Sequence, residues 1–99
     1  MALKGELSDK TRIKIREPKK YKVIMLNDDF TTMDFVVSIL IDIFKKDPAS
    51  AEQIMMFVHK NGKAVVGIYP YDIAVTKTDE ALRRAKAAGF PFRMQVVED

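Results

Sequence analysis

Hydrophobic and polar residues follow one another along this chain in blocks that predict a strand and then a helix near its beginning. Residues 21–26 are rich in β-branched and aromatic side chains and lead into Asn-Asp-Asp at 27–29, a pattern typical of a strand that enters a turn. Residues 33–44 repeat hydrophobic side chains at intervals of three and four, as an amphipathic helix does. Either Thr31 or Thr32 is suited to cap this helix.

A second helix is predicted directly after the first one. Asp47 is a typical N-cap residue, and Pro48 fits the first position of a helix. Asn61 and Gly62 indicate where this helix ends. Because only a few residues separate the two helices, we expect them to pack against each other as a hairpin.

The rest of the chain predicts a strand, a helix and a final strand. Residues 64–69 form a short hydrophobic run, which we interpret as a central strand, and Gly67 within it indicates a bulge or a close backbone approach. Residues 72–88 favour a helix that ends at Gly89, and residues 92–97 alternate as a strand does. The buried side of this helix is expected to carry Ile73, Ala81, Ala85 and Ala88.

The predicted order of elements, β-α-α-β-α-β, indicates the α+β fold class. We expect a single small domain with a three-stranded antiparallel sheet and three helices packed on one face. The length of 99 residues is that of one domain. Residues 1–17 are about half charged and lack a sustained hydrophobic period, so we expect residues 1–19 to be a flexible N-terminal extension and residues 20–99 to form the core.

Composition excludes several classes of function. The formal net charge of +3 is far below that of a dedicated nucleic-acid binder. The chain has no cysteine and one histidine, which excludes disulfides, thiolate catalysis and multi-histidine metal sites. No hydrophobic run reaches the roughly 20 residues of a membrane span, and none resembles a signal peptide. We therefore expect a cytoplasmic protein with no cofactor, no nucleic-acid partner and no membrane partner.

Polar residues next to the two paired helices are the first candidates for a binding site. An Asn-Asp-Asp sequence most often forms a simple turn, but its oxygens are also able to bind a metal, a lysine or a terminal ammonium. His59 follows Met55 by one helical turn and therefore lies at the edge of a hydrophobic patch. If the two helices pair, a small pocket forms. Its walls would be Met33, Val36, Met55 and Val58, and its rim would be Asn27, Asp28 and His59.

Catalytic and nucleic-acid-binding interpretations find less support in the sequence. A metal site at Asp28, Asp29 and His59 is disfavoured because adjacent carboxylates in a turn rarely face the same ion. A hydrolytic triad needs an activated nucleophile, and none of the serines occupies a strained elbow. The basic residues of the second half are scattered among acidic ones, without the aromatic strands of an RNA-binding module.

A specific family resemblance is carried by two stretches of sequence. YKVIMLNDDFTTMDFVV followed by IMMFVHKNGKAVVGIYPYDIAVTK strongly resembles the ClpS family of adaptor proteins, and the similarity covers residues 20 to about 97. The resemblance implies a non-catalytic adaptor that delivers N-degron substrates, with Phe, Leu, Trp or Tyr as first residue, to the ClpAP protease. It implies that the substrate α-ammonium is bound by Asn27, Asp28 and His59, with Asp29 holding the peptide beside it. It also implies a side-chain pocket lined by Thr31, Met33, Val36, Met55, Val58 and Phe92.

The same resemblance implies a protein partner, the N-terminal domain of the ClpA-type unfoldase. Docking would use Asp72 and Lys77, and the N-terminal extension would engage the unfoldase during hand-off. Nothing in the sequence demands more than a monomer. Three departures from the family pattern are Thr32 in place of Pro, Phe92 in place of Leu and Asp72 in place of Glu. We expect Phe92 to make the pocket shallower, so that Trp and Tyr bind less well than Leu and Phe.

Two alternatives remain open at the level of the sequence. The first is a ClpS-like modulator that docks on the unfoldase but has an altered degron specificity. The second is a ribosome-associated module, because the C-terminal domain of the ribosomal stalk protein has a similar arrangement of helices and sheet. That domain lacks the constellation from Asn27 to His59, which favours the adaptor interpretation.

Overall fold

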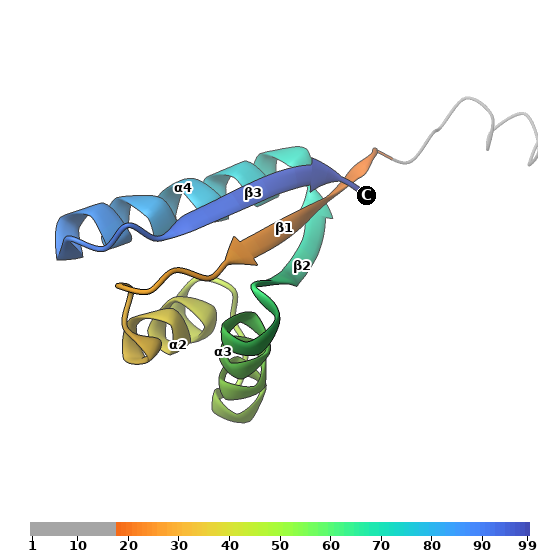
Figure 1. Cartoon of the computed structure of the whole chain (residues 1–99). Helices are drawn as coiled ribbons and strands as arrows, with labels where there is room; N and C mark the ends of the chain where they lie inside the picture. Colours follow the sequence, from red (N-terminus) through yellow and green to blue (C-terminus); the bar gives the residue numbers. More distant parts are fainter. Residues whose placement is uncertain (1–17) are drawn as a thin grey trace, which may run out of the picture.

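The computed structural model describes residues 18–99, so the predicted N-terminal extension lies almost entirely outside the described residues. Within this range the chain forms a small α+β domain, as predicted, with the elements in the order β-α-α-β-α-β (Figure 1). These elements are β1 (Lys20–Leu26), α2 (Met33–Asp42), α3 (Pro48–Asn61), β2 (Lys63–Pro70), α4 (Tyr71–Ala88) and β3 (Arg93–Glu98).

The three strands form one antiparallel sheet in the order β2-β1-β3. The prediction that residues 64–69 form a central strand is wrong, because β1 is central and β2 lies at an edge. Only part of the hydrophobic run in β2 enters the core: Val66 is 2% exposed, whereas Val65 and Ile68 are 47% and 48% exposed. A hydrophobic run alone does not distinguish a central strand from an edge strand with one open face.

The predicted irregularity at Gly67 is present in β2. The register between β1 and β2 shifts after Val23, so that Val66 has no partner in β1 and forms a bulge next to Gly67. A Cβ atom at Gly67 would collide with the ring and hydroxyl of Tyr69. Gly67 is therefore required because the side chain of Tyr69 lies close to it, and not because another backbone segment does.

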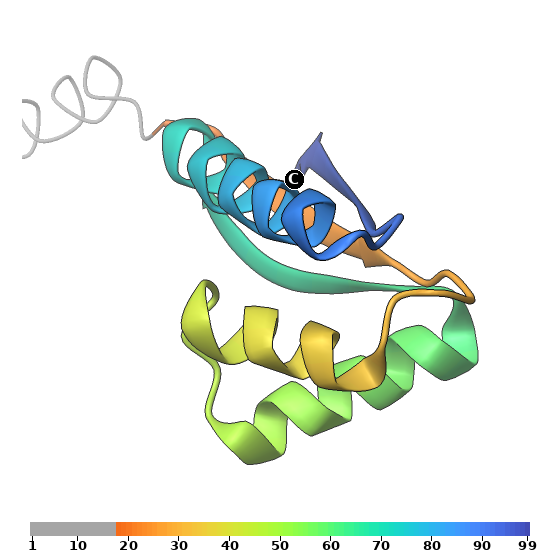
Figure 2. The ribbon, with the colours of Figure 1, turned by 90° about the vertical axis from the view of Figure 1, so that its left-hand side faces the viewer.

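The core lies on one face of the sheet. In β1 the side chains of Val23 and Met25 are fully buried, while those that alternate with them are only partly buried. α4 packs against all three strands, and α3 packs against α2 and β2. Figure 1 shows α4 running along β3 and β1 with α2 and α3 below them, and Figure 2 shows α2 and α3 side by side, as the predicted hairpin requires.

The ends of α2 and α3 follow local signals. The Thr32 hydroxyl accepts a hydrogen bond from the backbone N–H of Phe35 at 3.2 Å, so Thr32 is the N-cap of α2. α2 ends at Asp42, two residues before the predicted end at 44, and Lys45 then turns the chain with a positive φ of 58°. Asp47 caps α3 as predicted, and Gly62 ends it with a φ of 91° that favours glycine.

The predicted buried side of α4 is half wrong. Ala81 and Ala85 are buried as expected, but Ile73 is 45% exposed and Ala88 is exposed as well. The positions that face the core are Ala74, Thr78, Ala81 and Ala85. α4 packs against all three strands, and the small side chains on its buried side allow the helix to lie close to the sheet.

Two cations of α4 hold the C-terminal end of α2. Lys77 Nζ donates to the backbone carbonyl of Ile43 at 2.7 Å, and Arg84 bonds the carboxylate of Asp42 at 3.0 Å. Cations at this end of a helix also interact favourably with its dipole. α2 is therefore fixed at one end by its Thr32 cap and at the other end by α4.

Candidate ligand-binding pocket

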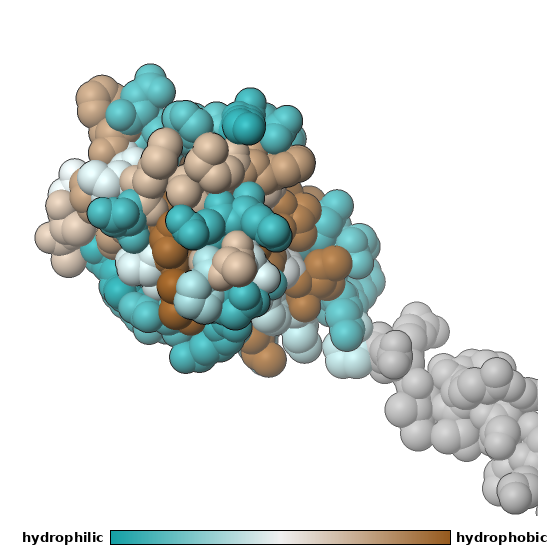
Figure 3. Space-filling view, turned by 90° about the horizontal axis from the view of Figure 1, so that it is seen from below, coloured by the Kyte–Doolittle hydropathy of each residue, from teal (hydrophilic) through white to brown (hydrophobic). Residues whose placement is uncertain are grey.

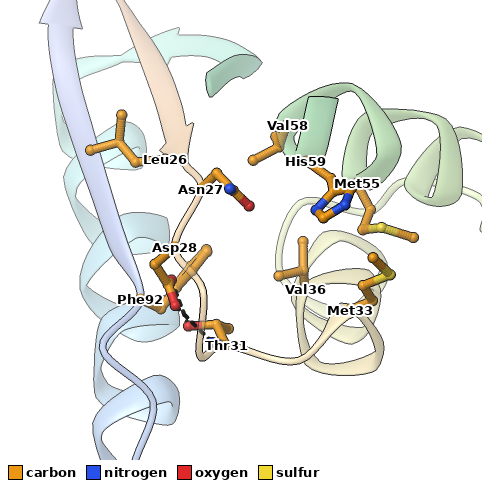
Figure 4. A pocket seen from close by; sticks show the side chains of 10 residues that line it. All are labelled: Leu26, Asn27, Asp28, Thr31, Met33, Val36, Met55, Val58, His59 and Phe92. Carbon is orange, nitrogen blue, oxygen red and sulfur yellow. Dashed lines mark hydrogen bonds between the residues drawn. The ribbon is translucent and has the colours of Figure 1, made fainter. Parts of the chain in front are cut away.

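A small pocket opens where the C-terminal end of β1 meets α2 and α3 (Figure 4). Its cavity volume is about 20 Å³, which is enough for about one water molecule. The lining residues are Leu26, Asn27, Asp28, Thr31, Met33, Val36, Met55, Val58, His59 and Phe92. The sequence predicts all of them except Leu26 as site residues, and the structure brings them together from four separate segments.

Three candidate residues lie outside the pocket lining. Asp29 is exposed in the loop between β1 and α2, next to Phe30, whose side chain is 76% exposed. Asp72 is exposed in the first turn of α4, and Lys77 lies one turn further along the same helix. The pocket and the predicted docking residues are thus on different elements.

Hydrogen bonds within its own loop hold the carboxylate of Asp28 in place. Oδ1 accepts from the backbone N–H of Phe30 at 2.8 Å and of Thr31 at 2.7 Å, and Oδ2 accepts from the Thr31 hydroxyl at 2.7 Å. Figure 4 shows Thr31 pointing at Asp28, so Thr31 positions this carboxylate in addition to lining the pocket. A carboxylate has about four acceptor positions, and three of them are used within the loop.

The same contacts keep Asp28 ionised. Partial burial alone would raise the pKa of Asp28, but the hydrogen bonds from Thr31 and Phe30 and the nearby charge of Arg93 together hold it below its usual value. Asp28 therefore carries a negative charge at neutral pH, with acceptor capacity left for a further donor.

Asn27 and His59 add two more polar groups to the pocket. The backbone N–H of Asn27 donates to the carbonyl of Gly62 at 2.9 Å, which ties the end of β1 to the end of α3. In Figure 4 the side-chain amide of Asn27 and the ring of His59 point toward one another across the pocket. Asn27 and Asp28 follow β1 and His59 lies in α3, so this backbone hydrogen bond holds together the two segments that carry the polar side chains.

The remaining lining is hydrophobic. Met55, Val58 and Phe92 are buried, whereas Met33 is 45% exposed at the pocket opening. Methionine side chains are unbranched and flexible, and they adapt to hydrophobic groups of different shapes. A small polar cluster beside apolar, adaptable walls is suited to a ligand with one cationic and one hydrophobic part.

Neither a metal site nor a membrane segment is found in the described part of the chain. Within residues 18–99, no three His, Asp or Glu side chains lie close enough together to hold a metal ion. Over the same range, no helix is both long enough and apolar enough to cross a membrane.

Comparison with known proteins identifies the class. The family model described as "ATP-dependent Clp protease adaptor protein ClpS" matches residues 16–95. The ClpS adapter of Clostridium acetobutylicum is 48% identical over 99% of both chains, and that of Treponema denticola is 52% identical over 97% of both. The solved structure of Agrobacterium tumefaciens ClpS2 bound to L-phenylalaninamide superimposes with a TM-score of 0.81 at 40% identity, over 84% of this chain and all of that one.

The fold and these similarities define a non-catalytic adaptor of an ATP-dependent Clp protease. The chain belongs to the ClpS family. This confirms the family resemblance, the fold class and the adaptor interpretation over the enzyme interpretation.

Proposed function

We propose that this protein captures proteins that begin with Phe, Leu, Trp or Tyr and delivers them to a ClpA-type unfoldase in the cytoplasm. The observation that carries the proposal is the convergence of Asn27, Asp28 and His59 on one end of an apolar pocket (Figure 4). The bound structure of the related ClpS2 supports it, because L-phenylalaninamide combines a free α-amine with a benzyl side chain.

The polar end of the pocket is suited to an α-ammonium group. An α-amino group has a pKa near 8 and is mostly charged at neutral pH. The ionised Asp28, the amide oxygen of Asn27 and a neutral nitrogen of His59 are all acceptors for its protons. Acetylation of the amine removes the charge and leaves the carboxylate without its partner, which at this partly exposed site should cost at least about 1.4 kcal/mol, or tenfold in affinity.

The apolar end is suited to a bulky side chain, but only after it opens. Burial of a Phe or Leu side chain contributes about 1.5–3 kcal/mol. The cavity of about 20 Å³ is too small for either side chain. Met33 is half-exposed at the opening and its side chain is unbranched and flexible, so we infer that a ligand enters by displacing it. An internal Phe supplies the hydrophobic part alone and would not bind.

Docking on the N-terminal domain of the unfoldase is proposed at the start of α4. Asp72 is exposed there between Tyr71 and Ile73, whose side chains are 55% and 45% exposed. Lys77 is half-buried, with Nζ 5.6 Å from the centre of the Tyr69 ring and bonded to α2. Asp72 and its two neighbours therefore offer the direct contact surface, whereas Lys77 would contribute from a fixed position. We propose that the adaptor acts as a monomer.

Fluorescence anisotropy tests recognition directly. A labelled peptide that begins with Phe should bind, whereas the same peptide with an acetylated α-amine should bind at least about tenfold more weakly. Asp28→Ala should abolish binding, and Asp79→Ala, which removes an exposed carboxylate from α4, should leave it unchanged. Circular dichroism of both variants checks that the fold is retained.

Equal affinity for the free and acetylated peptides would refute amine recognition. Binding of neither peptide would favour the alternative function, an unfoldase-docking modulator with altered degron specificity. Delivery is tested separately: a chain without residues 1–19 should bind the peptide normally and support slower degradation by the unfoldase and its protease. Normal degradation by that truncated chain would exclude a role of the extension in hand-off.

A further inference from the structure

The free edge of β2 forms an apolar groove with α3 on the side of α3 that faces away from the pocket. The groove has a volume of about 470 Å³ and is lined by Gln53, Ile54, Phe57, Ala64 and Val65, none of which is charged. Phe57 is 54% exposed and Val65 is 47% exposed. Viewed from the side of α2 and α3, the surface shows hydrophobic residues in separate groups between hydrophilic ones (Figure 3). The contiguous apolar lining of the groove, rather than these scattered groups, is the feature typical of an interaction site.

The open face of the sheet next to this groove is basic. The strand register places Lys22 between Ile68 and Val97, and Leu26 between Lys63 and Arg93. The central row of this face is Ile24 between Val65 and Gln95. The described strands thus carry four cations on this face, Lys20, Lys22, Lys63 and Arg93, and no carboxylate. Among residues 18–99 no strand pairs with the outer edge of β2.

We propose that a partner protein adds an extended segment as a further strand along the edge of β2, with apolar and acidic residues in alternation. Successive side chains of a strand point to opposite faces. One set would fill the groove beside Phe57, and the other would place carboxylates on the basic face, beside Lys63 of β2 and one strand away from Lys22 of β1. Backbone hydrogen bonds to a free strand edge give such complexes their affinity, and the side-chain pockets give them their specificity.

Charge favours an acidic segment of a partner protein over two alternative occupants of the groove. These alternatives are the N-terminal segment of this chain and the β2 strand of a second copy. Residues 1–17 contain five basic and three acidic residues, so this segment would bring like charge to the basic face. A second copy pairing through its own β2 (KAVVGIYP) would bring a lysine and no carboxylate. Nucleic acid is also disfavoured, because the exposed apolar side chains beside the cations are mainly aliphatic and offer little surface for base stacking.

The probe is the peptide acetyl-SEVEIEVES-amide, whose blocked amine keeps it out of the amine-binding pocket. NMR titration should show saturable binding with a Kd below about 1 mM, with amide shifts at Phe57, Val65 and Ile68. Phe57→Gln and Lys63→Glu should weaken binding by about tenfold. Phe30→Gln and Lys86→Glu make the same changes at exposed positions elsewhere and should leave the affinity unchanged.

Two further peptides separate specific binding from simple charge attraction. Acetyl-SEGEGEGES-amide has the same charge without the apolar residues, and acetyl-SKVKIKVKS-amide reverses the charge. Neither should bind. No saturation with the first peptide, equal binding of the glycine peptide, or tighter binding of a short oligonucleotide would overturn the proposal. Sedimentation of the free protein as a dimer, lost in Phe57→Gln, would assign the groove to a second copy instead.

Discussion

Replacing Thr31 by Val tests whether the loop holds an ionised carboxylate for the ligand. The change removes the hydroxyl that donates to Asp28 Oδ2 at 2.7 Å and keeps the backbone N–H that donates to Oδ1 at 2.7 Å. A hydrogen bond to a charged group contributes about 1.5–3 kcal/mol when buried. Because both residues are partly exposed, we expect a loss of about 1 kcal/mol in the free energy of unfolding at neutral pH.

The loss should depend on pH in a defined direction. Burial acts to raise the pKa of Asp28, but the hydrogen bonds and Arg93 lower it overall in the folded protein. A carboxyl group whose pKa is lowered by folding stabilises the protein above its unfolded pKa of about 3.9, and this stabilisation disappears as the pH falls through the folded value. Thr31→Val brings the two pKa values closer, so its destabilisation should be full at neutral pH and should fade toward low pH.

Urea unfolding of both proteins at neutral pH and at about pH 3 or below measures this difference. Thr31→Ser restores the hydroxyl and should recover most of the stability and most of the affinity for a peptide that begins with Phe. Equal destabilisation at both pH values would show that the hydroxyl does not act through an ionised Asp28. A serine variant as unstable as the valine variant would show that the loss comes from packing.

Three other substitutions test separate features. Met33→Ala should widen the pocket opening and admit peptides that begin with Val or Ile, and continued failure of those peptides in a binding assay would exclude Met33 as the gate. Thr78→Val should raise the free energy of unfolding by about 1 kcal/mol, because the buried Thr78 hydroxyl has no hydrogen-bond partner among the described residues; an unchanged or lower melting temperature would contradict this. Lys45→Gly should stabilise by about 0.5–1 kcal/mol, because a left-handed backbone costs less for glycine; destabilisation on chemical unfolding would show that the Lys45 side chain matters more than its backbone.

Local signals in the sequence predict most element boundaries of this fold. Asp47 and Gly62 act through hydrogen bonds and backbone geometry within a few residues, so their effects do not depend on the rest of the molecule. The position of β2 at the sheet edge depends on which strands pair, and the composition of its hydrophobic run does not contain that information. The buried side of α4 was mispredicted for a related reason. The close approach of α4 to the sheet favours the small Ala74 over the larger and more hydrophobic Ile73.

The pocket shows the same division between local and non-local information. Met55 and His59 are four residues apart and therefore lie next to each other on one side of α3, which the sequence alone predicts. Leu26 was missed because the alternation in β1 places it opposite the buried Val23 and Met25. The cavity volume was not predictable either, since it depends on side-chain conformations that hydrophobic patterns and residue spacing do not reveal.

The most direct test of the central proposal is an NMR titration with L-phenylalaninamide, which carries only the two groups that the pocket is proposed to bind. The signals of Asn27, Met33, Met55 and His59 should shift together and saturate, while N-acetyl-L-phenylalaninamide should leave them unchanged. Equal shifts with both compounds would contradict amine recognition by Asp28. Shifts confined to the groove beside Phe57 would place the binding of hydrophobic ligands on the other side of α3.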